Sequence, residues 1–378
     1  MLEIGAPELR TYLVGHLGLN QFQTPERESP VAFLLARGHC LQLDPLSPMG
    51  TATDLVAAAR LSDYRLDDLF HNARVGDYFE HYAKERCLIE PAAFYHYPAV
   101  VSQAPWVRIA ERMDRLDTAL IDDVLFEIRE RGPLRATDLT DRGRVEPLDW
   151  SGWKGTAKAS VMALEILWSY MRVVISHRLN GERFYDVPER VFKPQTDHQE
   201  DGLHWLLNRR MAAAGVLSAA GGPQWSMLDP ARTSGMPDQM VESGEWVAFK
   251  VKGYPRKYYA PSGFLERSFP ESDNEVRILS PLDPLIWDRK LVAQAFDFDY
   301  VWEVYKPAKT RRWGWYVCPL LQGHHLVGRV EARVQGQVLV VDKVWNEARI
   351  PRSHIRRALT RHARICNCTL QGPAHWLS

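Results

Sequence analysis

One short segment pairs an amide with a carboxylate at a spacing that could do chemistry. One apolar residue separates Gln42 from Asp44, so their side chains point the same way if the segment is extended. Pro45 and Pro48 exclude a helix through the segment and stiffen the loop that follows. A carboxylate beside an amide can orient a water molecule and accept its proton.

The spacing alone does not establish a site. A Gln-x-Asp triplet arises about once by chance in a chain of this length. Asp44 could instead cap a following helix, which is a common role for a loop aspartate. On these residues alone the capping role is the simpler interpretation, and the catalytic role stays open beside it.

Other familiar catalytic signatures are absent from the sequence. It contains no Walker loop, dinucleotide fingerprint, HExxH helix or G-x-S-x-G elbow. His81 and Glu85 would share a face of a helix, but without a third ligand a surface pair is the better interpretation than a metal site. His324 and His325 fall in a predicted turn. We therefore expect neither a metal nor a cofactor.

The bulk composition indicates a chain of several modules. Its 378 residues are too many for one compact core, and a hydrophobic content of 46% is ordinary for a globular protein. No stretch approaches the ~20 apolar residues that span a bilayer, and the N-terminus lacks a signal-peptide pattern. We therefore expect no membrane partner. The five cysteines are odd in number and mostly far apart, which favours a cytoplasmic location.

Charge is balanced over the chain but clustered within it. The 47 basic residues equal the 47 acidic ones, so the total does not indicate nucleic acid. Residues 249–259 and 305–316 interleave basic with aromatic side chains, and residues 349–364 hold six arginines and no carboxylate. A solvated surface explains any one cluster. Three of them favour an anionic partner with stackable bases.

Residues 118–171 predict a group of helices. Apolar residues recur at helical spacing from Thr118, and Gly132-Pro133 stops that helix. Residues 135–141 could form a short second helix. A longer periodic run then starts at Gly155.

A β-hairpin is predicted directly after this run. Strands over residues 173–178 and 183–187 flank Asn180-Gly181, which suits a type I′ turn. Three helices followed by a hairpin is the order of a winged helix-turn-helix. The helix before the wing usually faces DNA, and here it begins with Lys154 and Lys158.

The same order is predicted again downstream. A helix over residues 203–211 ends at Gly215, and residues 246–251 and 256–260 form a second candidate wing. A further helical unit with polar breaks is expected over residues 1–75.

The C-terminal third predicts strands over residues 313–321, 326–334 and 337–345, which suggest a small barrel or meander. The predicted fold class is α+β, with tandem winged helix-turn-helix units and a small C-terminal β-barrel. The expected domains are a first unit with the Gln42 loop, two winged helices, and a barrel with a basic C-terminal helix, over residues 1–117, 118–197, 198–270 and 271–378.

Four blocks of sequence resemble one known family. Residues 41–47, LQLDPLS, look like the Gln-apolar-Asp catalytic motif of the winged-helix alkylpurine and crosslink-repair DNA glycosylases, the YcaQ/AlkZ-like group. Residues 79–89 (FEHYAKERCLI), 279–289 (LSPLDPLIWDR) and 298–330 resemble further blocks of that family. The similarity extends from about residue 30 to 345.

The resemblance implies a monofunctional DNA glycosylase that removes alkylated purines, N7-alkylguanine above all, and that could also act on interstrand crosslinks. Its partner would be double-stranded DNA, it would act as a monomer in base-excision repair, and Gln42 and Asp44 would be catalytic. Candidate DNA-binding residues are Lys154, Lys158, Lys309, Arg311, Arg312 and Trp313, and candidate supports of the pocket and loop are Pro45, Ser47, His81, Tyr82 and Lys84.

The chain departs from the family pattern at two positions. Lys84 stands where the family tends to have a histidine, and Pro48 stands where a small apolar residue is more usual. Both bear on the contacts of the pocket. The alternative function is a non-catalytic winged-helix regulator, which the composition and the two hairpins suit equally well. The length, the C-terminal block and the Gln-Leu-Asp loop disfavour it.

Overall fold

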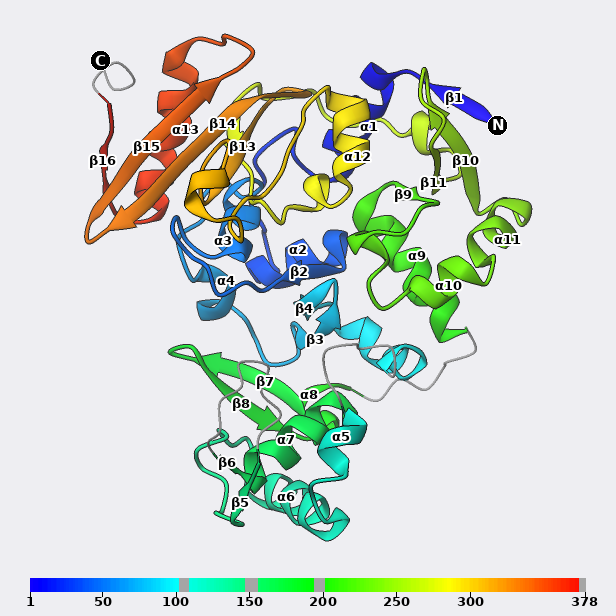
Figure 1. The fold of residues 1–378 in the computed structure, drawn as a ribbon, viewed down its shortest axis with the longest axis vertical. Coiled ribbons are helices and arrows are strands. Elements are labelled where there is room, and N and C mark those ends of the chain that lie inside the picture. Colours follow the sequence, from blue (N-terminus) through cyan, green and yellow to red (C-terminus); the bar gives the residue numbers. More distant parts are fainter. Residues whose placement is uncertain (102–108, 147–155, 194–200, 374–378) are drawn as a thin grey trace.

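The computed structural model describes residues 1–101, 109–146, 156–193 and 201–373. Small sheets alternate with helices along the chain, which confirms the predicted α+β class (Figure 1). Residues 109–146 and 156–193 form a lobe at one end of the long axis, and the N-terminal and C-terminal parts lie together at the other (Figure 1). Within the described ranges, no helix is long and apolar enough to cross a membrane.

The N-terminal part carries the small sheet that positions the candidate loop. Its elements are β1 (Leu2–Ile4), α1 (Ala6–His16), α2 (Pro30–Gly38), β2 (Cys40–Gln42), α3 (Ala52–Ala58), α4 (Asp68–His71), β3 (Phe79–Ala83), β4 (Glu85–Ile89) and the 3₁₀ turns Pro91–Tyr95 and Tyr97–Ala99. The strand order is β2-β4-β3, and both pairings are antiparallel. Ser29 caps α2, because its hydroxyl accepts a hydrogen bond from the amide of Ala32.

Residues 79–89 form a hairpin, so the prediction that His81 and Glu85 share a helical face is wrong. Glu85 takes a positive φ of 71° at the turn. Nearly all of β3 is buried, on both of its faces, so the alternation of polar and apolar residues that marks a half-exposed strand is missing.

The lobe of residues 109–193 contains α5 (Ile109–Met113), α6 (Thr118–Arg131), β5 (Arg144–Val145), β6 (Ala157–Lys158), α7 (Ala159–Ser169), β7 (Val174–Leu179), β8 (Glu182–Asp186) and α8 (Pro188–Val191). The predicted hairpin is confirmed: β7 and β8 pair across Asn180 and Gly181, whose φ values of 52° and 80° suit a type I′ turn. Residues 135–141 form turns, so the predicted second helix is wrong. The backbone N–H and guanidinium of Arg135 both donate to Asp138 and close this turn instead.

The next part comprises α9 (Gly202–Ala214), β9 (Leu217–Ser218), the 3₁₀ turn Pro223–Trp225, α10 (Asp229–Thr233), α11 (Met236–Glu242), β10 (Trp246–Val251), β11 (Lys257–Pro261) and the 3₁₀ turn Phe264–Glu266. Gly215 ends α9 as predicted, with a φ of 71°. The β10–β11 hairpin is not a free wing, because β1 pairs in parallel with β10 and β9 pairs with β11. The tandem winged-helix arrangement and the domain boundaries therefore stay predictions.

The C-terminal part consists of β12 (Val276–Ile278), the 3₁₀ turns Pro284–Ile286 and Ala308–Thr310, α12 (Arg289–Phe296), β13 (Val317–Gln322), β14 (His325–Gln335), β15 (Val338–Asn346), α13 (Arg352–Ile365) and β16 (Thr369–Gln371). In the described residues the five strands form an open sheet in sequence order, with β12 and β16 as its edges, so the small barrel is not confirmed. The strand predicted over residues 313–321 starts later, at Val317, so its predicted first four residues lie outside β13. Ile355 and Leu359 of α13 pack into the core that covers this sheet.

Two arginines join segments that are far apart in sequence. The guanidinium of Arg60 donates to both carboxylate oxygens of Asp283, at 2.7 and 3.1 Å, and to the carbonyl of Leu17. Arg361 of α13 donates to the carbonyls of Ala58 and Leu61 at the end of α3. The segment from β2 to α3 is thus fastened to the C-terminal part of the protein.

Candidate active site

The loop after β2 keeps the extended geometry predicted for the Gln-Leu-Asp segment. Leu41 pairs with Leu88 in β4, and the amide of Leu43 donates to the carbonyl of Arg86 one residue beyond the strand. Leu41 and Leu43 pack in the same apolar cluster. Because side chains alternate along extended backbone, Gln42 and Asp44 lie on the opposite side of the segment.

Asp44 is half-buried, and one of its two carboxylate oxygens is free to accept a hydrogen bond in the described structure. Its Oδ1 accepts a hydrogen bond of 2.9 Å from the amide of Leu46, and Oδ2 has no hydrogen-bond partner among the described residues. Burial raises the pKa of the carboxyl group, and the Leu46 amide opposes that rise. Thr51 caps α3, so the helix-capping role considered for Asp44 is wrong.

Gln42 is oriented by Lys84, which lies in the turn between β3 and β4. The ammonium of Lys84 donates a hydrogen bond of 2.7 Å to Oε1 of Gln42. An ammonium can only donate, so the amide oxygen faces Lys84 and the Nε2 group faces away with its two N–H donors. Lys84 is 7% exposed, and burial lowers the pKa of its ammonium.

The rest of the loop is held by the C-terminal part. The amide of Val334 in β14 donates to the carbonyl of Pro48 at 2.7 Å, and His362 of α13 contacts the carbonyl of Met49 at 2.8 Å. Pro45 and Ser47 themselves are exposed. These bonds fix the backbone on the far side of Asp44, so the carboxylate is held at both ends of its loop.

His81 and Tyr82 of β3 pack against α7. His81 is buried, and its Nε2 lies 3.2 Å from the carbonyl of Ser169. Its ring packs against Trp168, with centroids 5.0 Å apart, and Tyr82 packs against the same indole. Burial lowers the pKa of His81 to about 4, so its ring is neutral at pH 7. Across the described ranges, no group of three or more His, Cys, Asp or Glu could hold a metal ion.

The predicted DNA contacts fall into two sets. Lys154 lies outside the described residues, and Lys158 is half-buried directly before α7, a helix whose residues are mostly buried. The second set lies in the exposed segment before β13. Lys309 and Arg312 are exposed, and the Nε of Arg311 donates to the carbonyl of Lys306.

Trp313 packs within the protein. Its ring stands edge-on to Trp345, and the guanidinium of Arg329 lies 4.0 Å from its centroid. Tyr316 follows in the same segment, and its buried hydroxyl has no partner among the described residues. Burial raises the pKa of Tyr316, and the charges of Cys318 and Asp44 raise it further. Tyr316 also packs in one apolar cluster with Leu46 and Met49, so this segment lies beside the candidate loop.

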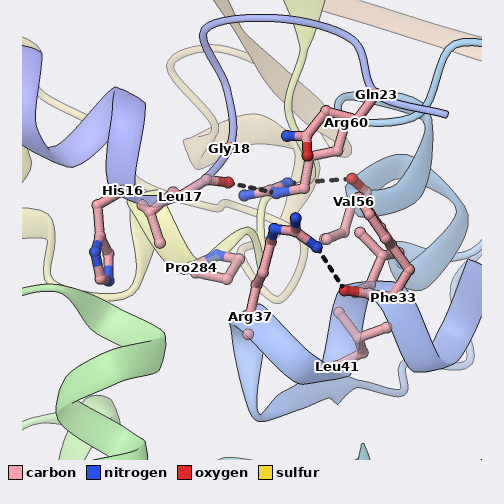
Figure 2. A pocket seen from close by; sticks show the side chains of 12 residues that line it. His16, Leu17, Gly18, Gln23, Phe33, Arg37, Leu41, Val56, Arg60 and Pro284 are labelled. Carbon is pink, nitrogen blue, oxygen red and sulfur yellow. Dashed lines mark hydrogen bonds between the residues drawn. The ribbon is translucent and has the colours of Figure 1, made fainter. Parts of the chain in front are cut away.

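Figure 2 shows a small cavity lined by residues from α2, α3 and the end of α1. Neither Gln42 nor Asp44 lines it. Leu41, Arg37 and Arg60 are among its lining residues, and its volume is about 30 Å³. That volume holds roughly one or two water molecules and is too small for a purine. The cavity lies on the Leu41 side of the loop, opposite Gln42 and Asp44.

A larger cavity of about 340 Å³ has Lys84 among its lining residues. Gln224 and Arg256 line it, and so do Trp287 and Lys290 of the block after Pro281. Gln224 was missed in the sequence, because a glutamine in a Gly-Gly-Pro-Gln turn carries no local signal of a site. Residues 279–289 carry part of the resemblance to the family, but their pattern predicts no role for any one side chain.

Comparison with known proteins gives the class of this protein, a DNA glycosylase, which is a hydrolase of DNA repair. Residues 35–365 match the model of the family described as DNA glycosylase AlkZ-like, and the chain belongs to that family. The structure is also similar to the DNA glycosylase AlkZ of Streptomyces sahachiroi, with a TM-score of 0.63 and 15% sequence identity. That alignment covers 98% of this chain and 100% of the other, which shows a shared fold over the whole length.

Proposed function

We propose that this glycosylase is monofunctional and hydrolyses the N-glycosidic bond of alkylated purines in duplex DNA, with Asp44 and Gln42 as its catalytic residues. N7-alkylguanine is the foremost substrate, and bases joined in interstrand crosslinks are further candidates. The observation that carries the proposal is the half-buried Asp44 carboxylate, which has one oxygen unbonded in the described structure and lies on the same side of its loop as Gln42.

Asp44 would act on the charge that develops in the sugar. As the bond from C1′ to the base nitrogen lengthens, positive charge builds on the deoxyribose, as in other glycoside hydrolyses. The carboxylate stabilises that charge, and water then bonds to C1′ and gives a proton to Asp44. The bonding electrons leave with the base. A cationic alkylpurine departs as a neutral molecule, so the step needs no general acid.

Gln42 would orient the water or the sugar through its Nε2 donors, since its oxygen is engaged by Lys84. Lys84 serves this mechanism as a positioning residue and forms no imine with the sugar. Base removal therefore leaves an intact strand with an abasic site. Lys309, Arg311 and Arg312 would contact phosphates from the exposed segment beside the loop, with the protein acting as a monomer. A cytoplasmic location stays a prediction.

The test is the release of 7-methylguanine from alkylated duplex DNA by the purified protein. We expect release that EDTA does not change, no release of unmodified guanine, and no covalent adduct after borohydride treatment. Borohydride reduces an imine to a stable amine, so a trapped adduct would show that a lysine is the nucleophile and would overturn the monofunctional mechanism. Absence of release from every alkylated substrate tried would overturn the proposed substrate class.

A further inference from the structure

The cavity of about 340 Å³ beside Lys84 has the features of an anion site. It lies between the β3–β4 turn, the turn at Gly221–Gln224 and the segment Pro281–Lys290. Its cationic lining residues are Lys84, Arg256, Arg289 and Lys290. Its one acidic lining residue is Asp288.

The negative charge of Asp288 is already engaged. Its Oδ1 accepts hydrogen bonds from the amides of Lys290 and Leu291 at the start of α12, at 3.0 and 3.1 Å. Its Oδ2 accepts from Nη2 of Arg256 at 3.3 Å. Arg289 and Lys290 are exposed and have no carboxylate partner among the described residues. The cavity therefore keeps an excess of positive charge facing its interior.

Gln224 supplies a second, independent indication of a ligand. Its side chain is 2% exposed, and neither its Oε1 nor its Nε2 has a hydrogen-bond partner in the described structure. A buried amide without partners costs free energy, which a ligand with acceptor oxygens would recover at Nε2. A Cβ at position 222 would lie 2.6 Å from Oε1 of Gln224, so Gly222 leaves the space in front of this amide open.

One side chain contacts both the cavity and the proposed catalytic pair. Lys84 lines the cavity, and its Nζ also lies 2.7 Å from Oε1 of Gln42. An ammonium has three donors, so Lys84 can bind Gln42 and an anion at the same time. A group bound in the cavity could therefore contact the same lysine side chain that contacts Gln42 of the candidate active site.

We propose that this cavity binds one phosphodiester group of the DNA strand, a few nucleotides at most from the damaged base. The inference rests on the proposed function, because it assumes that Gln42 marks the position of that base. A phosphodiester offers two acceptor oxygens and one negative charge, which match the cations and the Nε2 group of Gln224. The excess positive charge disfavours the alternative that a cationic alkylpurine itself occupies the cavity.

The experiment is a scan of single phosphates. The probe is a duplex with one tetrahydrofuran abasic analogue, in which successive phosphodiesters are replaced one at a time by neutral methylphosphonates. We expect the wild-type protein to lose about tenfold in affinity at one position, the loss of a charged hydrogen-bonded contact. The double variant Arg289→Ala with Lys290→Ala should bind the unmodified probe more weakly. Its affinity should not fall further when the methylphosphonate replaces the phosphodiester that the wild type contacts.

Two further variants make the result specific. Arg27→Ala with Arg65→Ala removes two exposed cations that do not line the cavity, and should keep the position-dependent loss of the wild type. Gly222→Ala changes no charge but fills the space at Gln224, and should behave like the Arg289 and Lys290 variant. Circular dichroism confirms that each variant is folded.

The proposal is overturned if the Arg289 and Lys290 variant keeps the wild-type pattern at every phosphate. It is also overturned if deoxyguanosine monophosphate displaces the probe at the same concentration as unlabelled duplex does, because the cavity would then bind free nucleotide. Release of 7-methylguanine is measured separately. If release fails while the phosphate pattern holds, the proposed substrate falls and the phosphate site stands.

Discussion

The ammonium of Lys84 lies 2.7 Å from Oε1 of Gln42, although 42 residues separate them in the chain. This contact fixes which end of the Gln42 amide faces Lys84 and leaves the Nε2 group on the opposite end. A histidine, which the family tends to have at this position, has a shorter side chain and a proton that can be lost near neutral pH. The pair therefore gives one departure from the family pattern, Lys84, a positioning role in the proposed mechanism.

Replacing Lys84 by Met should lower the single-turnover rate of 7-methylguanine release about tenfold, because Gln42 can then rotate away from its productive orientation. Lys84→Arg should recover part of the rate, since it restores a cationic donor. The KM for DNA should change less than the rate constant if Lys84 acts by positioning Gln42. Equal loss in Lys84→Met and Lys84→Arg, with both folded, would contradict this role.

Asp44→Asn should reduce the rate of base release by about 10²–10³, since the amide keeps the shape of the side chain but removes its negative charge. Single-turnover release of 7-methylguanine measures the effect, and circular dichroism checks the fold. The matched control is Asp63→Asn, which changes an exposed carboxylate outside the loop and should leave the rate unchanged. A folded Asp44→Asn protein that keeps more than about a third of the wild-type rate would refute the catalytic assignment.

The acid side of the pH–rate profile should report Asp44. Its ionised form is the active one in the proposed mechanism, so protonation at low pH should lower the rate. Burial raises the pKa of Asp44, and the rate should therefore begin to fall at a higher pH than for an ordinary aspartate. In Asp44→Asn the residual rate should lose this acid limb. An unchanged limb in the variant would assign the titration to another group.

Arg311→Ala with Arg312→Ala should weaken DNA binding uniformly across sequences. If both side chains contact phosphates, the slope of log K against log salt concentration should flatten by about one to two units. Binding to a labelled duplex at a series of salt concentrations measures the slope. A slope equal to that of the wild type would place both arginines outside the DNA interface.

Asp283→Ala should destabilise the protein by about 3–5 kcal/mol, because it leaves the Arg60 guanidinium buried without its counter-charge. Urea titration measures the loss of unfolding free energy. Asp299→Ala is the control, because Asp299 forms an exposed pair with Arg312 and should contribute less than about 1 kcal/mol. A loss for Asp283→Ala no larger than for Asp299→Ala would show that the buried pair does not hold the two segments together.

Local sequence determined the features whose causes lie within a few residues. Pro45 and Pro48 exclude a helix at the candidate loop, and the loop is extended as predicted. Gly215 ends α9, and Asn180-Gly181 turns the β7–β8 hairpin, because both positions need a positive φ. Each of these signals depends on backbone sterics, which neighbouring residues decide.

Tertiary structure alone decided the contacts that complete the site. Residues 79–89 become strands because β4 pairs with β2 and is covered on both faces, a context that their own pattern does not contain. The same pairing brings Lys84 to Gln42, and packing of the C-terminal part brings Tyr316 into one apolar cluster with Met49 of the candidate loop. Such contacts join residues 42 or more positions apart. Their free energy depends on which surfaces meet on folding, and no local spacing records that choice.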